Sequence, residues 1–110
     1  MSAVLASFWN KGERIDHVAG ADLAANEIVV IGKRIGVAGA DIASGEKGAV
    51  YVEGVFKMPK TSGAITAGAL VYWDATNKYI TTTSTDNTLA GFATEAAASD
   101  DDTVFVKINA

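Results

Sequence analysis

The residues best suited to acid–base or metal chemistry lie near the start of the chain. His17 is the only histidine, and it stands beside Asp16 and close to Glu13. An imidazole next to a carboxylate can act as a general base or contribute one metal ligand. In a strand, however, neighbouring side chains point to opposite faces, so Asp16 would face away from His17. We therefore interpret His17 as a structural or surface residue.

The sequence lacks the patterns of nucleophilic and zinc-dependent enzymes. It contains no Gly-x-Ser-x-Gly segment, no cysteine and no second histidine. A nucleophile elbow, a disulfide framework and a typical zinc site are therefore excluded. We expect neither a metal nor a cofactor, and we do not expect an enzyme.

Two groups of carboxylates are further candidates for a metal site or for catalysis. Asp100, Asp101 and Asp102 are consecutive, whereas a calcium loop places its ligands at alternate positions. We interpret them as solvated charges in a turn. Glu53 and Asp74 could form the carboxylate pair of a glycosidase, but the sequence does not fix the distance between them.

The 11 glycines do not form a phosphate-binding loop. A Walker motif built on Gly32 and Lys33 would need glycine at position 27 and serine or threonine at position 34, where the sequence has Glu27 and Arg34. We therefore assign the glycines to turns and bulges.

Aromatic residues provide two candidate contact regions. Phe8 and Trp9 precede a turn-like segment, and we interpret residues 1–12 as an N-terminal arm. These two rings either pack into their own core, which would order the terminus, or pack on another chain. Tyr72 and Trp73 could stack on a sugar or a base if exposed, although core filling is the more common use of such rings.

The strongest strand pattern spans residues 48–60. Val50, Val52 and Met58 belong to an apolar series, Gly54 interrupts it and Pro59 follows it. A glycine inside a strand pattern indicates a bulge or bend, and proline ends a central strand. We predict one long strand that bends at Gly54 and helps a small sheet to close on itself.

Short apolar runs of similar character fill the rest of the chain, and none has a helical period. They cover residues 14–18, 27–31, 33–38, 69–74, 79–83, 89–95 and 103–109. We expect an all-β protein: a small closed β-barrel or a compact β-sandwich with an N-terminal arm. Residues 13–110 are predicted to form a single β domain. No internal repeat of useful length is apparent.

Composition narrows the possible partners. The net charge is −4, with acidic residues concentrated after position 94, so we expect no nucleic-acid partner. No stretch approaches the roughly 18 apolar residues of a membrane helix, and the start lacks a basic leader, so we expect a soluble, unprocessed protein with no membrane contact. Many of the apolar residues are alanine, which predicts a thin core and favours oligomerisation.

Several segments together resemble a family of small phage-encoded proteins. They include Lys33-Arg-Ile-Gly-Val-Ala38, Asp41-Ile-Ala-Ser-Gly-Glu46, Val52-Glu-Gly-Val-Phe-Lys-Met-Pro-Lys60, Ile65-Thr-Ala-Gly68, Val71-Tyr-Trp-Asp74, Leu89-Ala-Gly-Phe-Ala93 and Thr103-Val-Phe-Val-Lys-Ile108. This family, long described as a domain of unknown function and sometimes as recombinase-like, resembles the capsid decoration (head cement) proteins of tailed phages and prophages. The missing Walker motif gives the recombinase description no support.

The resemblance implies a structural capsid decoration protein of the virion, made in the bacterial host cytoplasm. It implies a homotrimer that binds the outer head surface, with the major capsid protein as partner, and stabilises the shell. On this hypothesis Phe8, Trp9 and Arg14 contact the capsid or a neighbouring subunit. The alternative is a small β-barrel binding module for carbohydrate or a host surface, which would need Tyr72 and Trp73 exposed together.

Overall fold

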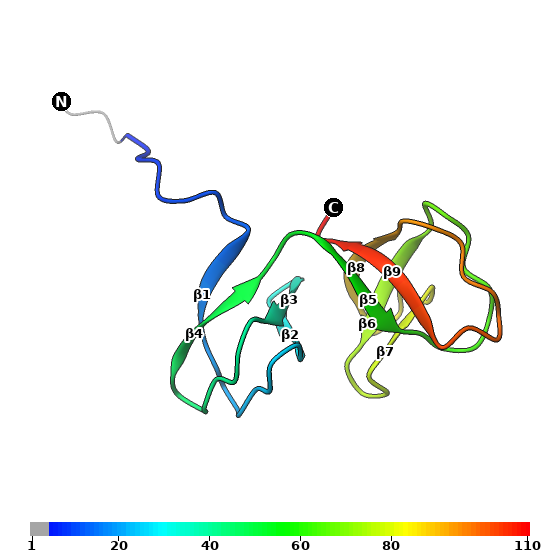
Figure 1. Cartoon of the computed structure of the whole chain (residues 1–110), viewed down its shortest axis with the longest axis horizontal. Helices are drawn as coiled ribbons and strands as arrows, with labels where there is room; N and C mark the ends of the chain where they lie inside the picture. Colours follow the sequence, from blue (N-terminus) through cyan, green and yellow to red (C-terminus); the bar gives the residue numbers. More distant parts are fainter. Residues whose placement is uncertain (1–4) are drawn as a thin grey trace.

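Two antiparallel β-sheets, arranged one after the other along the long axis, make up the fold (Figure 1). The structure is a computed structural model that describes residues 5–110, and within that range it contains nine strands and no helix. The all-β class predicted from the sequence is therefore confirmed.

The first sheet lies in what we call the N-terminal lobe, residues 13–52. Its strands are β1 (Arg14–Val18), β2 (Ile28–Ile31), β3 (Arg34–Ala38) and β4 (Lys47–Tyr51), in the order β1-β4-β3-β2. The loops before β2 and before β4 meet at a bridge between Leu23 and Ile42. This bridge folds both loops over one face of the sheet.

The second sheet lies in the C-terminal lobe, residues 54–110. Its strands are β5 (Val55–Pro59), β6 (Leu70–Asp74), β7 (Tyr79–Thr81), β8 (Thr88–Ala93) and β9 (Thr103–Ile108), in the order β5-β9-β8-β6-β7. The edge strands β5 and β7 approach each other at a bridge between Lys60 and Ile80. No closed barrel is found among residues 5–110, so neither the barrel nor the sandwich prediction is confirmed.

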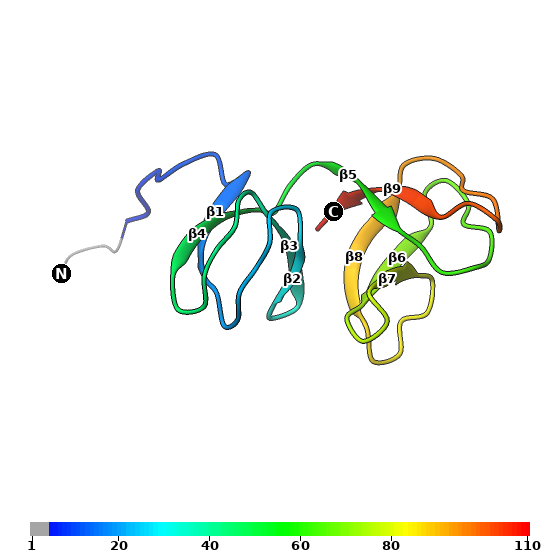
Figure 2. The same cartoon turned by 60° about the horizontal axis from the view of Figure 1, so that its bottom comes forward.

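The two lobes share one topological plan, which Figure 2 shows from a second side. Strands β1, β2, β3 and β4 correspond in order and pairing to β5, β6, β8 and β9, and β7 is an additional strand beside β6. The bridge between Ile65 and Ala97 corresponds to the bridge between Leu23 and Ile42. The expectation that the chain has no internal repeat is therefore wrong at the level of topology.

The predicted long strand over residues 48–60 is also wrong. The structure divides it into β4 and β5, which belong to different sheets. Gly54 lies between them with φ of +124°, a backbone conformation that residues with a Cβ rarely adopt. Gly54 thus marks the crossing from one lobe to the other. Pro59 is the last residue of β5, as the pattern predicted.

The cores of the two lobes differ in size, and β3 belongs to both. The larger core lies in the C-terminal lobe and includes Met58, Val71, Trp73, Ile80, Val104, Val106 and Ile108. Ile35 and Val37 of β3 pack into this core, whereas Ala38 belongs to the small core of the N-terminal lobe. Alternate residues of β3 therefore connect the lobes through apolar contacts.

Asn109 adds a polar connection between the lobes. Its side-chain amide donates to the carbonyl oxygens of Ile35 and Val52, each at 2.8 Å. Its Oδ1 accepts from the N–H of Ile35 at 3.2 Å. Its own N–H donates to the carbonyl of Ala90 at 2.7 Å. One residue thus holds the ends of β4 and β9 against the start of β3.

Candidate functional site

The N-terminal arm carries the most exposed large apolar side chains of the described chain. Leu5, Phe8 and Trp9 are 82%, 85% and 87% exposed. Figure 1 shows that the arm extends from β1 away from both lobes. The alternative in which Phe8 and Trp9 pack into their own core is therefore wrong. That they contact another chain stays a prediction.

Arg14 lies outside the arm, at the first position of β1. Its guanidinium is 5.8 Å from the centroid of the Tyr51 ring, which in turn lies 6.1 Å from the ring of Phe56. An exposed cation–π contact of this kind contributes about 0.5–1 kcal/mol. Arg14 is thus part of the sheet surface, and its role in partner binding stays a prediction.

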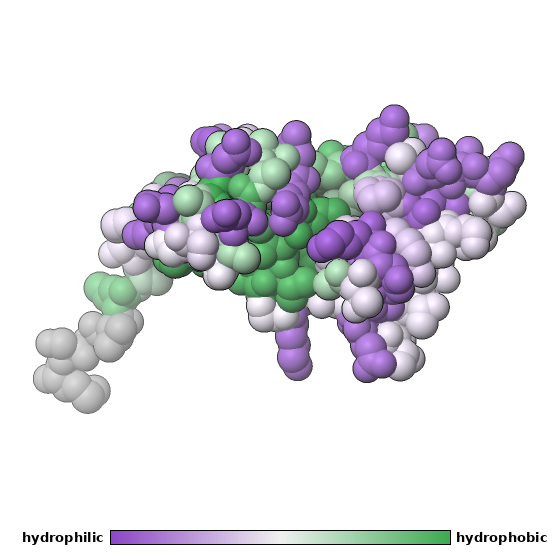
Figure 3. All heavy atoms as spheres, turned by 90° about the horizontal axis from the view of Figure 1, so that it is seen from below, coloured by the Kyte–Doolittle hydropathy of each residue, from purple (hydrophilic) through white to green (hydrophobic). Residues whose placement is uncertain are grey.

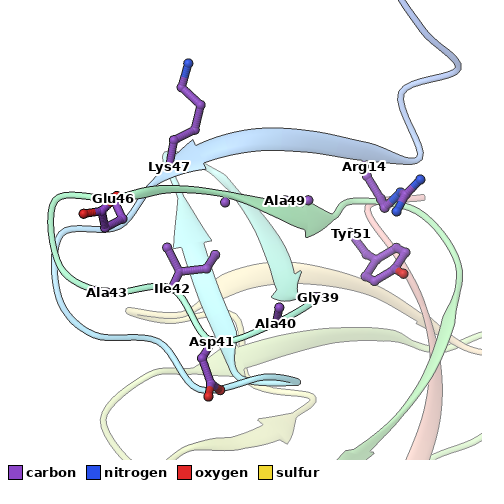
Figure 4. Close-up of a pocket in the computed structure, with 11 residues that line it drawn as sticks. Arg14, Gly39, Ala40, Asp41, Ile42, Ala43, Glu46, Lys47, Ala49 and Tyr51 are labelled. Carbon is purple, nitrogen blue, oxygen red and sulfur yellow. The ribbon is translucent and has the colours of Figure 1, made fainter.

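A shallow pocket lies beside this surface, between β4 and the loop that precedes it (Figure 4). Its volume is about 450 Å³. Arg14 and Tyr51 lie together at one end, while Asp41, Glu46 and Lys47 point in different directions. A binding site for a small molecule directs a few polar groups toward one ligand. The polar side chains of this pocket point apart, so the pocket does not have the arrangement of such a site.

His17 and Asp16 lie on opposite faces of β1, as the strand pattern predicted. His17 pairs in register with Gly48, and Asp16 pairs with Ala49. The partly buried His17 occupies the position that Met58 holds in the C-terminal lobe. Among residues 5–110, no group of three or more His, Asp or Glu side chains could hold a metal ion.

Asp101, a candidate cation ligand, and Asp74, a candidate catalytic carboxylate, both hold turns. The side chain of Asp101 accepts from the N–H of Ala98 at 2.8 Å. The carboxylate of Asp74 accepts from the side-chain amide of Asn77 at 2.9 Å and from the N–H groups of Thr76 and Asn77. The Asn77 side-chain bond is the main reason why the pKa of Asp74 is lowered. Both groups therefore stabilise local structure.

Tyr72 and Trp73 lie on opposite faces of β6. Trp73 is 6% exposed and belongs to the large core, whereas Tyr72 is half-buried on the other face. A stacking platform needs both rings exposed together. The geometry therefore disfavours the carbohydrate-binding alternative.

The outer face of the C-terminal sheet carries exposed apolar residues that the sequence analysis did not single out. Register aligns Val55 of β5, Phe92 of β8 and Leu70 of β6 on one row, with Lys107 between the first two. Phe105 is exposed on the same sheet. The signal in the sequence was the presence of apolar residues on both faces of β9, where Phe105 lies between Val104 and Val106.

The described chain is an all-β protein with an aromatic arm that extends into solvent. Its Asp74 and Asp101 carboxylates accept hydrogen bonds within turns, an arrangement typical of a structural protein. The chain belongs to the family of phage cement proteins, which matches residues 9–108. The resemblance noted in the sequence is confirmed, and the match includes Trp9 and both lobes. The family is structural rather than enzymatic and belongs to the phage capsid.

Neither a curated protein nor a solved structure matched the chain in the same comparisons. Within residues 5–110 there is no helix of the length and apolar character needed to cross a membrane.

Proposed function

We propose that the protein binds the outer head surface of a tailed phage or prophage particle as a homotrimer, at local three-fold positions, and stabilises the shell. The major capsid protein is the partner on the shell. The family match over residues 9–108 is the observation that carries this proposal. The protein is made in the cytoplasm of the bacterial host and joins the head after synthesis.

In this proposal Phe8, Trp9 and Arg14 contact the capsid or a neighbouring subunit. Phe8 and Trp9 are exposed, and the arm that carries them extends away from both lobes (Figure 1). Large aromatic side chains bury about 150–250 Å² each when they enter an interface. Three linked subunits act together on the shell, so modest individual contacts give tight binding through avidity.

Binding to phage heads tests the proposal. Purified protein is mixed with heads that lack it, and bound protein is measured after sedimentation. We expect saturable binding at three copies per local three-fold position and a higher temperature of head disruption. We expect the variant F8S/W9S to lose at least about tenfold in affinity, because its arm no longer buries aromatic surface.

Val55→Ser is the matched control, since Val55 is an exposed apolar residue outside the arm. It should bind like the wild type. A wild type that fails to bind heads contradicts the proposed function, and full binding by F8S/W9S contradicts the role of the arm.

A further inference from the structure

The four sheet edges in the described part of the chain are protected unequally. Charged residues Arg14 and Asp16 lie on β1, Lys57 and Pro59 lie on β5, and β7 has 3 residues. Charge, proline and short length each hinder pairing with another chain. The strand β2, Ile28–Ile31, has only β-branched apolar residues. It is the edge most open to an added strand.

The comparison of the lobes shows what β2 lacks. Its counterpart β6 is covered by β7, which pairs with it from Tyr72 to Asp74. Val71 and Trp73 of β6 are fully or nearly buried. Their counterparts in β2, Val29 and Ile31, are only half-buried. The N-terminal sheet is therefore the same sheet with its fifth strand missing.

The backbone of β2 offers hydrogen-bonding groups on its open side. β2 and β3 are joined by a two-residue turn, so the closing pair Ile31 and Arg34 is hydrogen-bonded. Because bonded and non-bonded pairs alternate, the N–H and C=O groups of Ile28 and Val30 point away from β3. Val30 is 37% exposed, and Figure 3, which views the molecule from below, shows an apolar area near its centre.

A groove of about 520 Å³ adjoins this edge at the junction of the lobes. Gly32 of the β2–β3 turn and Arg34 of β3 line it on one side. Tyr72 and Leu89 line it from the C-terminal lobe. Most of its surface is apolar. It offers a site for a large side chain from a strand added to β2.

We propose that the N-terminal arm of a second copy of this chain pairs with β2 as the fifth strand and places an aromatic ring in the groove. This inference rests on the proposed homotrimer and names its contact. The arm leaves from β1, at the opposite edge of the same sheet from β2. Each copy therefore gives an arm on one side and receives one on the other, a head-to-tail contact that can close into a ring of three.

Charge favours an antiparallel pairing. Lys11 is the only charged residue in segment 5–12, Glu27 precedes β2, and Lys33 follows it. An antiparallel arm brings Lys11 to Glu27, whereas a parallel arm brings it to Lys33. The pairing of β7 with β6 is also antiparallel.

The surface that the arm can bury against a second copy is large enough for a specific contact. Phe8 and Trp9 together with Leu5 bury roughly 500 Å² per arm, at about 150–250 Å² for each aromatic ring. With the matching surface of the receiving copy this gives about 1,000 Å² per contact, the lower range of specific interfaces. Closure of three contacts adds to the stability of the ring.

The test is the mass in solution, measured by sedimentation equilibrium, of the wild type and variants with unchanged circular dichroism. Val30→Lys places a charge on the proposed edge, and Val18→Lys is its control on the opposite edge, where Val18 is 58% exposed. We expect the wild type and V18K to be trimers and V30K to associate at least about tenfold more weakly. Val30→Pro, which keeps an apolar residue but removes one outward N–H, should act like V30K.

The arm variant F8S/W9S should also dissociate. A trimeric V30K overturns the inference. Dissociation of V30K while F8S/W9S stays trimeric also overturns it, because β2 would then pair with a segment other than the arm. A wild type that is monomeric at about 100 µM overturns it as well. Binding to phage heads separates the two proposals. If V30K is a trimer and binds heads, only the contact between the arm and β2 is refuted. If the wild type is a trimer that does not bind heads, only the proposed function is refuted.

Discussion

The N-terminal and C-terminal lobes have the same strand plan but are completed in different ways. The C-terminal lobe adds β7 to its sheet and builds the larger core. The N-terminal lobe has four strands, a small core and the extended arm. From this difference we propose a division of roles, in which the C-terminal lobe gives stability and the N-terminal lobe presents the surfaces for assembly.

The N-terminal lobe compensates for its small core with side-chain hydrogen bonds between its loops. Asp22 accepts from the N–H of Ser44, and Asp41 accepts from the N–H of Ala25, each at 2.8 Å. The two bonds flank the bridge between the loops in a reciprocal arrangement. In the C-terminal lobe alanine occupies both corresponding positions, Ala64 and Ala96.

The largest expected effect comes from two glycines at corresponding positions of the lobes. Gly91 has φ of +148°, and a Cβ there would overlap the backbone carbonyl of Lys107. A Cβ on Gly36 would meet side-chain atoms of Ile31 and Val50 at 3.1 and 3.2 Å, which can shift. We expect Gly91→Ala to cost at least about 3 kcal/mol in urea unfolding and Gly36→Ala about 1 kcal/mol. The register between β6 and β8 shifts at Val71 and Tyr72, which leaves an extra residue, a bulge, in β8. Equal costs would contradict the view that this bulge distinguishes the C-terminal lobe.

The next effect concerns the connection between the lobes. The wild type, predicted to be one domain over residues 13–110, should unfold in a single transition. Asn109→Ala leaves backbone groups of Ile35 and Val52 without their partner and should cost about 2–3 kcal/mol.

Asn109→Gly is the matched control for backbone conformation, because Asn109 has φ of +57°. It loses the same side-chain bonds but avoids the steric cost, so it should be about 1 kcal/mol more stable than Asn109→Ala. Calorimetry should show a broadened or split transition in both variants. A sharp, unshifted transition would show that apolar contacts of β3 alone connect the lobes.

The smallest effect concerns the loop contacts of the N-terminal lobe. Asp22→Ala and Asp41→Ala each remove one exposed hydrogen bond and should cost about 1 kcal/mol. Asp16→Ala, an exposed carboxylate on β1, is the control and should change stability by less than about 0.5 kcal/mol. Urea unfolding gives all three values. If D22A and D41A match D16A, these bonds do not support the lobe.

Sequence patterns predicted strand content, the arm and the family because these depend on local alternation, turn residues and recognisable segments. They did not predict that residues 48–60 divide between two sheets, since an apolar strand has the same pattern in either sheet. A short repeat is visible within the N-terminal lobe, because Ala19-Gly-Ala-Asp-Leu23 and Ala38-Gly-Ala-Asp-Ile42 are nearly identical. The repeat between the lobes is hidden, because alanine stands at positions 64 and 96 where the N-terminal lobe has Asp22 and Asp41.

The candidate contact surfaces were predictable to different degrees. Phe8 and Trp9 were identified as large aromatics, but only the structure shows that they are exposed. The β-branched run at residues 27–31 is typical of a buried strand, whereas it forms β2 at an edge of its sheet. Edge position depends on which strands pair across long stretches of chain, and local sequence does not encode it.

Hydrogen–deuterium exchange of the wild type, compared above and below the concentration at which it assembles, tests the division of roles most directly. We expect assembly to protect amides in the arm and those of Ile28 and Val30 in β2. Amides of β5 to β9 should exchange at unchanged rates. Protection that appears instead on the outer face of the C-terminal sheet, around Val55 and Phe105, would contradict the account.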